Sequence, residues 1–251
     1  MDAALKLPRR DFLAISGSLT GVAVLCWIYL FYMSRDICCM HIPVWGTAYF
    51  WMMFLMWVIM MVGMMVPSAI PMILIYAAVA KKAEKQGMPI ASTGAFTAGY
   101  ILIWVLFSFL ATLLQWQLDK AALLSPMMTA NSPKFSAGLL MAAGIYQCVP
   151  VKDNCLNHCR SPFHFISTHW RPGNAGAFWM GISHGFFCIG CCWLLMLLLF
   201  VFGVMNILWI AIIAIFVFLE KVLPLGNQGG KIIGILMGMA GAAMLLYKFL
   251  A

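Results

Sequence analysis

The stretch 51–66 reads WMMFLMWVIMMVGMMV, and the apolar run continues as PSAIPMILIYAAVA to Ala80 without a single charged side chain. About 20 consecutive apolar residues in a helix suffice to cross the ~30 Å hydrocarbon layer of a bilayer. This run is longer than that, so it predicts a membrane-spanning helix rather than a helix from a water-soluble core.

Similar apolar runs recur along the whole chain. Of its 251 residues, 65% are hydrophobic and only 9% are charged, a composition that excludes a water-soluble globular protein. The sequence predicts an all-α, polytopic transmembrane helical bundle of about seven spans. They lie at about 12–33, 48–79, 94–118, 135–150, 176–203, 204–220 and 231–249. The longest polar connection, roughly 150–175, is too short for a domain of its own, so we expect residues 1–251 to form one integral membrane domain.

The distribution of Lys and Arg predicts the orientation of the bundle. With a cytoplasmic N-terminus, most of the basic residues fall in inner segments, namely Lys6, Arg9, Arg10, Lys81, Lys82, Lys85, Lys152, Arg160, Arg171, Lys221 and Lys231. This positive-inside bias favours seven spans, a cytoplasmic N-terminus and a multi-pass protein of the bacterial inner membrane. The interpretation requires a turn near Gly203–Asn206, because without it the count drops to six. Since topology explains the net charge of +8, we expect the lipid bilayer and no nucleic acid as a partner.

A second informative stretch lies inside the expected span 176–203. Met180, His184, Cys188, Cys191 and Cys192 are spaced so that they gather on one helical face. A thioether, an imidazole and three thiols form a set of soft ligands that suits Cu(I), zinc or a redox couple. Ionisable groups inside a span usually face the bundle interior and mark a functional site. We therefore interpret His184 and the three cysteines as metal ligands.

The polar connection before this span carries further candidate ligands. Cys155 and Cys159 share one helical turn, and His158 stands beside Cys159. In the cytoplasm thiols stay reduced, so clustered cysteines there indicate metal ligands or redox-active thiols rather than a structural disulfide. Lys152 and Arg160 nearby favour the thiolate form. We hypothesise that the connection folds back and brings these ligands close to the helix that carries the other three cysteines.

Methionines form two stripes along the first stretch: Met53, Met56, Met60 and Met64 on one face, and Met61, Met65 and Met72 on another. One interpretation is a route for a soft metal, with Met60 and Met64 as ligands. The alternative is that methionine only fills the core of the bundle as an adaptable apolar side chain. Pro67 and Pro71 are expected to kink or break this helix near its cytoplasmic end.

Two smaller features leave alternatives open. The vicinal pair Cys38-Cys39, followed by His41, is a weaker candidate for trapping metal on the outer side. Gly234 and Gly238 lie four residues apart, a spacing that lets helices pack closely either within the chain or in a homodimer.

Four stretches carry a resemblance to a known family. They read WVIMMVGMMVPSAIPM at 57–72, KDNCLNHCRSP at 152–162, GISHGFFCIGCCWLLM at 181–196 and EKVLP at 220–224. In these stretches the chain resembles a bacterial family of predicted metal-binding integral membrane proteins whose domain has no assigned function. The resemblance covers roughly 48–240 and implies a membrane location and metal binding at the matching Cys and His residues. It implies no particular reaction or substrate.

Three functions remain open from the sequence. The first is the handling of a transition metal by transport, insertion or homeostasis, with copper favoured over zinc because thiolate and thioether ligands select Cu(I). The second is a membrane thiol–disulfide oxidoreductase that uses Cys188-x2-Cys191, since the first thiol of such a motif is often activated. The third is an accessory subunit of a membrane-bound metalloenzyme, with that enzyme complex as its partner.

Overall fold

In the computed structural model the described residues are 7–37, 45–125, 128–223 and 226–250. Almost all of them are helical, as the sequence predicts, and the expected all-α class is confirmed. The helices are α1 (Arg9–Ile37), α2 (Thr47–Lys85), α3 (Thr93–Lys120), α4 (Pro133–Cys148), α5 (Pro150–Arg160), α6 (Pro162–His169), α7 (Gly173–Leu197), α8 (Leu199–Phe202), α9 (Ile207–Val222) and α10 (Gly226–Leu250). The outer candidate site at Cys38-Cys39 and His41 lies outside the described residues.

Helix length separates the expected spans into two groups. Five segments of the described chain are long and apolar enough to cross a membrane: Arg9–Arg35, Thr47–Lys85, Thr93–Lys120, Gly173–Phe202 and Gln228–Tyr247. Helices α4 and α9 have only 16 residues each, about 24 Å at 1.5 Å per residue, which is less than the ~30 Å of a hydrocarbon layer. The helices expected at 135–150 and 204–220 therefore exist, whereas the count of seven spans and the orientation stay predictions.

The turn near Gly203–Asn206, on which the count of spans depends, is present. Gly203 has a φ of 98°, and α9 begins directly after Asn206, whose side chain accepts a hydrogen bond from the Leu208 amide at 3.2 Å. At the far end of α9, the Lys221 ammonium lies 2.9 Å from the sulfur of Cys188 on α7. This contact forms where the end of α9, which packs mainly against α2, meets α7.

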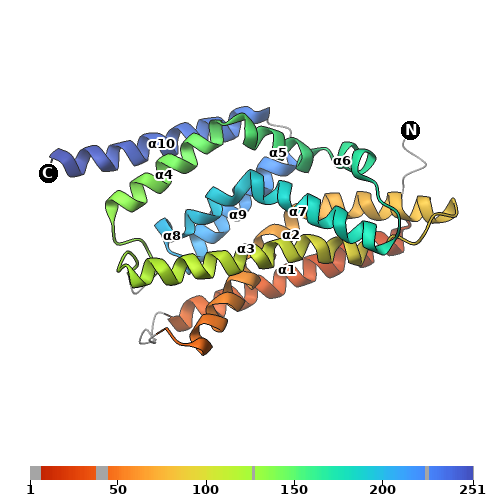
Figure 1. Ribbon diagram of the computed structural model, residues 1–251, viewed down its shortest axis with the longest axis horizontal. Helices are drawn as coiled ribbons and strands as arrows, with labels where there is room; N and C mark the ends of the chain where they lie inside the picture. The colour runs from red at the N-terminus through yellow and green to blue at the C-terminus, as the bar shows by residue number, and fades with distance from the viewer. Residues whose placement is uncertain (1–6, 38–44, 126–127, 224–225, 251) are drawn as a thin grey trace.

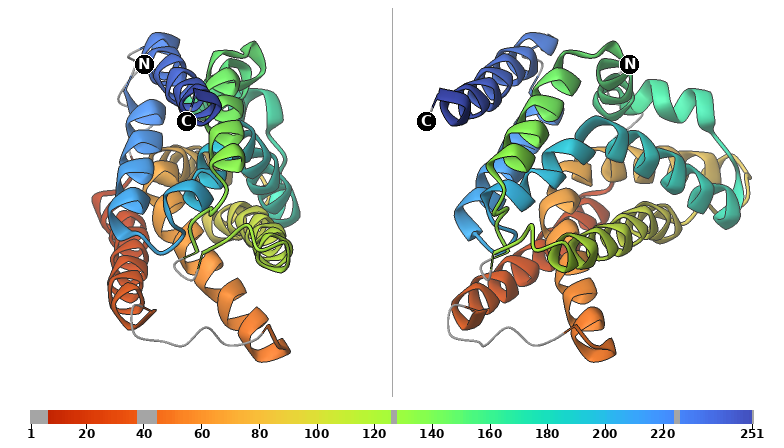
Figure 2. Two further views of the ribbon diagram at one scale, coloured as in Figure 1. Left: turned by 90° about the vertical axis from the view of Figure 1, so that its left-hand side faces the viewer. Right: turned by 60° about the vertical axis from the view of Figure 1, so that its left-hand side comes forward.

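Helix α7 lies in the middle of the molecule and packs against α3 and α5 (Figure 1). Helices α4 and α10 form a closely packed pair at the edge farthest from α1, as Figures 1 and 2 show. The outer faces carry exposed apolar side chains, among them Leu25 on α1 and Ile235 and Leu236 on α10. An extensive apolar surface is typical of contact with lipid or with a partner.

Glycines allow α3 and α7 to approach each other closely. A Cβ atom on Gly181 would lie 2.0 Å from the carbonyl oxygen of Phe96, and one on Gly99 would lie 2.2 Å from that of Phe178. No side chain fits at either distance, so the two backbones meet directly, as in other closely packed helix pairs. The close approach places Tyr100 of α3 against the cysteine-bearing face of α7.

The glycines of α10 serve the same purpose within the chain. A Cβ atom on Gly144 of α4 would lie 2.5 Å from the carbonyl oxygen of Gly234 and 2.7 Å from the amide nitrogen of Gly238. The close packing that the sequence left open between one chain and a homodimer is therefore used between α4 and α10 of the same chain. A homodimer stays a prediction.

Helix α2 continues through Pro67 and Pro71, so of the expected kink or break the break does not occur. Because proline has no N–H group, Pro67 cannot donate to the carbonyl of Gly63 four residues earlier. The indole nitrogen of Trp27 on α1 donates to that oxygen instead, at 3.2 Å. A neighbouring helix thus satisfies the freed carbonyl, which explains why α2 tolerates proline in apolar surroundings.

The close contact of α3 and α7 yields a matched pair of variants. We expect Gly181→Ala to lower the midpoint of thermal unfolding in detergent, because overpacking a well-packed interior typically costs ~1–3 kcal/mol. Gly138→Ala on α4 is the control, since no atom lies within 4 Å of its Cβ position. It should leave the midpoint unchanged or raise it slightly. Equal effects of the two substitutions would contradict the packing described here.

Candidate metal centre

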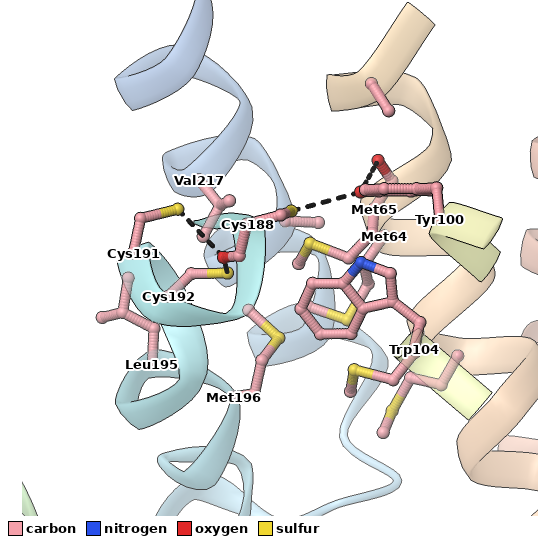
Figure 3. Close-up of a cluster of buried hydrophobic side chains, with 14 of the residues drawn as sticks. Met64, Met65, Tyr100, Trp104, Cys188, Cys191, Cys192, Leu195, Met196 and Val217 are labelled. Carbon is pink, nitrogen blue, oxygen red and sulfur yellow. Dashed lines mark hydrogen bonds between the residues drawn. The ribbon is translucent and has the colours of Figure 1, made fainter. Parts of the chain in front are cut away.

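Three cysteines of α7 are buried in the core. Cys188, Cys191 and Cys192 are each only about 1% exposed. The thiols of Cys191 and Cys192 both donate to the backbone carbonyl of Cys188 at 3.0 Å, so their sulfurs gather around one helical turn (Figure 3). The Cys188 side chain points instead toward Tyr100 (Figure 3).

The sulfur of Cys188 is the centre of a polar network. It lies 2.9 Å from the Lys221 ammonium and 3.2 Å from the hydroxyl oxygen of Tyr100, which in turn lies 3.2 Å from the Met65 carbonyl oxygen. An ammonium group beside a cysteine stabilises the thiolate, the form that binds soft metals. The network therefore presents Cys188 as a paired thiolate in an otherwise apolar interior.

Lys221 is the functional residue that the sequence analysis missed, since it was assigned to a cytoplasmic connection as a topological charge. Its side chain is buried, and its ammonium also contacts the Ser68 hydroxyl at 3.1 Å and the Met65 sulfur at 3.9 Å. The signal that could have identified it is its place in the stretch EKVLP at 220–224, the only one of the four family-like stretches without Cys, His or Met.

Helix α5 brings its two cysteines to α7. Cys159 lies beside Cys188 and Cys191, and its interactions with them together with burial raise the pKa of Cys159 well above its usual range. Cys155 packs against Gly190, where a Cβ atom would lie 2.7 Å from its sulfur, and burial raises its pKa. The five cysteines of α5 and α7 thus form one sulfur cluster, defined as Cys155, Cys159, Cys188, Cys191 and Cys192.

Lys152 and Arg160 both contact Glu220 at the end of α9. Lys152 forms a buried ion pair with Glu220 on α9, and it also donates to Gln147. The Arg160 side chain donates to the carbonyl of Glu220 at 2.8 Å. Both contacts fasten α5 to the end of α9, one residue before Lys221. Their role is to position Cys159 and Lys221 against Cys188.

His184 lies among aromatic rings one turn before Cys188. Its ring centroid is 5.5 Å from that of Tyr100, 5.6 Å from that of Phe165 and 6.0 Å from that of Phe96. The side chain is 3% exposed, and its Nδ1 atom has no hydrogen-bond partner among the described residues. Buried polar atoms are rarely left unpaired. An orphaned imidazole nitrogen beside the sulfur cluster is therefore a candidate ligand.

His158 has different surroundings. Its ring stacks on that of Phe187 at 4.2 Å, and its Nδ1 atom pairs with the Asn154 carbonyl at 2.8 Å. The rings of His164 and His169 lie 6.2 and 6.4 Å away. Within the described chain no hydrogen bond joins His158 to the cysteine sulfurs, so the structure groups it with two other histidines.

The methionines proposed as ligands lie in the apolar core. Met60 and Met64 are almost fully buried, and Met64 lines an apolar cavity of about 460 Å³ together with Trp27 and Phe218. Met65, on the other stripe, is the methionine whose sulfur reaches the Lys221 ammonium. Figure 3 shows Met64 and Met65 across from the cysteines, beside Tyr100 and Trp104.

The sulfur cluster is not a preformed metal site with three or more Cys, His, Asp or Glu ligands. Among the residues that the structure describes, no three Cys, His, Asp or Glu side chains are arranged to hold a metal ion. Structural zinc requires a closed tetrahedral set of four ligands. Two sulfur atoms, those of Cys188 and Met65, lie near the Lys221 ammonium instead.

Comparison with known proteins identifies the family. A family model described as PpoB2, copper chaperone, matches residues 54–244. The chain belongs to this copper chaperone family. The match contains all four stretches noted in the sequence, and with them the sulfur cluster, His184 and Lys221. No curated protein and no solved structure matches the chain.

The contribution of the Lys152–Glu220 ion pair to stability can be tested by substituting two carboxylates. Glu220→Gln leaves the Lys152 charge buried without its carboxylate partner, so we expect the substitution to destabilise the protein by about 3–5 kcal/mol. Asp153→Asn is the control, because its pair with Lys231 at 3.3 Å is more exposed and should contribute less than about 1 kcal/mol. Denaturant unfolding in detergent measures both. Similar losses would show that the Glu220 pair is not a buried support of the site.

Proposed function

We propose that the protein is an integral membrane copper chaperone that holds Cu(I) as cargo in the sulfur cluster of α5 and α7. The observation that carries the proposal is the convergence of Cys159 from α5 on Cys188 of α7, with the Lys221 ammonium beside the Cys188 sulfur. Membership of the copper chaperone family supports copper as the metal.

The ligand chemistry favours Cu(I) over zinc. Thiolate and thioether sulfur atoms select Cu(I), and Cys188, Cys159 and Met65 offer both kinds around one point. His184 adds an unpartnered nitrogen one turn away, and we propose it as a further ligand. Cys191 and Cys192 can replace Cys188 or Cys159 as copper ligands while the ion is transferred, because their thiols are held on the same helical turn as Cys188.

The surroundings support a membrane location. Five described helices are long and apolar enough to span a bilayer, and large apolar side chains such as Leu25 and Leu236 are exposed. We propose that the protein lies in the bacterial inner membrane with its N-terminus in the cytoplasm. Helices α4 and α9 complete seven spans if the bilayer thins locally around them, which costs only fractions of a kcal/mol per Å of mismatch.

Neither of the other two functions gains support. The family description favours neither a thiol–disulfide oxidoreductase nor an accessory subunit of a metalloenzyme. No disulfide joins the three cysteines of α7, and the Cys191 thiol donates its hydrogen bond to the backbone carbonyl of Cys188. The outer cysteines that the oxidoreductase would need as an acceptor lie outside the described residues.

The proposal is tested by titrating the purified protein with Cu(I) in detergent against a coloured Cu(I) chelator. We expect stoichiometric binding that Cys188→Ser weakens by more than about 100-fold, because even the partners of metal ligands contribute 10–100-fold to affinity. Cys148→Ser is the matched control, since that thiol is exposed at the end of α4. Retention of full affinity in Cys188→Ser would rule out the sulfur cluster as the copper site.

A further inference from the structure

The ammonium of Lys221 occupies a position with the character of a metal site. The atoms around it come from two helices: the Cys188 sulfur of α7 at 2.9 Å, the Ser68 hydroxyl of α2 at 3.1 Å and the Met65 sulfur of α2 at 3.9 Å. Two of these three atoms are sulfurs of the kinds that select Cu(I). A positive charge is therefore held where soft-metal ligands converge.

The other buried lysine shows that this environment is unusual. Lys152, only a short distance away in the fold, pairs with the Glu220 carboxylate, the ordinary partner of a buried ammonium. No ion pair with a carboxylate is formed by Lys221 within the described chain. Glu220, the neighbour of Lys221 in the sequence, pairs with Lys152. The sulfur of Cys188 therefore remains as the anionic partner of Lys221.

We propose that Lys221 is the resident cation of the copper site, which Cu(I) displaces on loading and which returns when Cu(I) leaves. The inference rests on the copper-chaperone function proposed above. A metal–thiolate bond is about 2.3 Å long, so a copper ion on the Cys188 sulfur facing Met65 would overlap the nitrogen that now lies 2.9 Å from that sulfur. The two cations therefore occupy the site in turn.

The exchange balances in charge and electrons. The ammonium and Cu(I) each carry one positive charge, so the Cys188 thiolate is neutralised in both states. Loading forms a copper–sulfur bond and breaks the ammonium–thiolate contact. Copper stays Cu(I), no electron is transferred, and the ammonium keeps its proton as it moves to water.

The position of Lys221 in α9 allows this movement. It lies in the last turn of the helix, and the next two residues, Val222 and Leu223, are exposed. The lysine side chain is a flexible stem of four carbons, which can swing toward the surface while the backbone stays in place. The contacts of Lys152 and Arg160 with Glu220 hold that backbone.

The returning ammonium explains how a buried site can release a tightly bound ion. Without it, the departure of copper would leave a bare thiolate in apolar surroundings, which is strongly unfavourable. The ammonium removes this penalty, so it weakens equilibrium binding and speeds transfer. Both effects suit a chaperone, whose cargo must be given up to an acceptor.

Displacement can be followed on the wild-type protein by chemical labelling of lysines. The copper-free and Cu(I)-loaded proteins are treated with an amine-acetylating reagent, and the extent of labelling at each lysine is read by peptide mass spectrometry. We expect labelling of Lys221 to rise several-fold on loading. Lys152 should stay protected in both states, and Lys82, which is exposed on α2, should be labelled equally in both.

The copper content of the same samples separates the two ideas. If copper binds stoichiometrically while Lys221 stays protected, the displacement is overturned and the chaperone function stands. If no copper binds, the proposed function is overturned, and the resident-cation role with it.

A pair of variants tests release. We expect copper bound to Lys221→Gln to pass to excess chelator several-fold more slowly than copper bound to the wild type, whereas Lys221→Arg, which keeps the positive charge, should release it at close to the wild-type rate. Lys82→Gln is the control for loss of a lysine elsewhere. Release from Lys221→Gln as fast as from the wild type would overturn the proposal.

Discussion

The contact between the Lys221 ammonium and the Cys188 sulfur is the interaction on which the rest of the site depends. An ammonium or a thiolate alone in an apolar interior is strongly unfavourable, whereas the pair is tolerated when its geometry is good. The contact requires the turn at Gly203, after which α9 packs against α2 and its end meets α7. It also requires the tie between Lys152 and Glu220, which fixes α5 and the end of α9 on the same side of the cluster.

The helices could be predicted from the sequence because apolar runs of membrane length leave few alternatives. The expected span 94–118 corresponds to α3 at Thr93–Lys120, and 48–79 lies within α2. The number of crossings could not be predicted with the same force, since α4 and α9 are apolar but short. A sequence shows where an apolar helix begins and ends, whereas its tilt and burial depend on neighbouring helices.

The site could be predicted only in part from the sequence, for a related reason. Helical spacing placed the three cysteines of α7 on one face, but it could not show which methionine approaches the site. In the structure the Met65 sulfur lies 3.9 Å from the Lys221 ammonium. Lys221 was hidden because a lysine at the end of an apolar helix looks the same in sequence whether it lies in water or folds inward. His158 and His184 differ in the same way, since only the structure shows that the first ring is half-buried against Phe187 and the second fully buried.

The central claim is that copper is held by the sulfur cluster around Cys188, and X-ray absorption at the copper edge tests it most directly. For the Cu(I)-loaded protein, the account predicts a first shell dominated by sulfur at about 2.3 Å, the length of a metal–thiolate bond. A first shell of nitrogen or oxygen atoms alone would contradict it. Such a result would place the metal elsewhere, for example at the three histidines near Phe187.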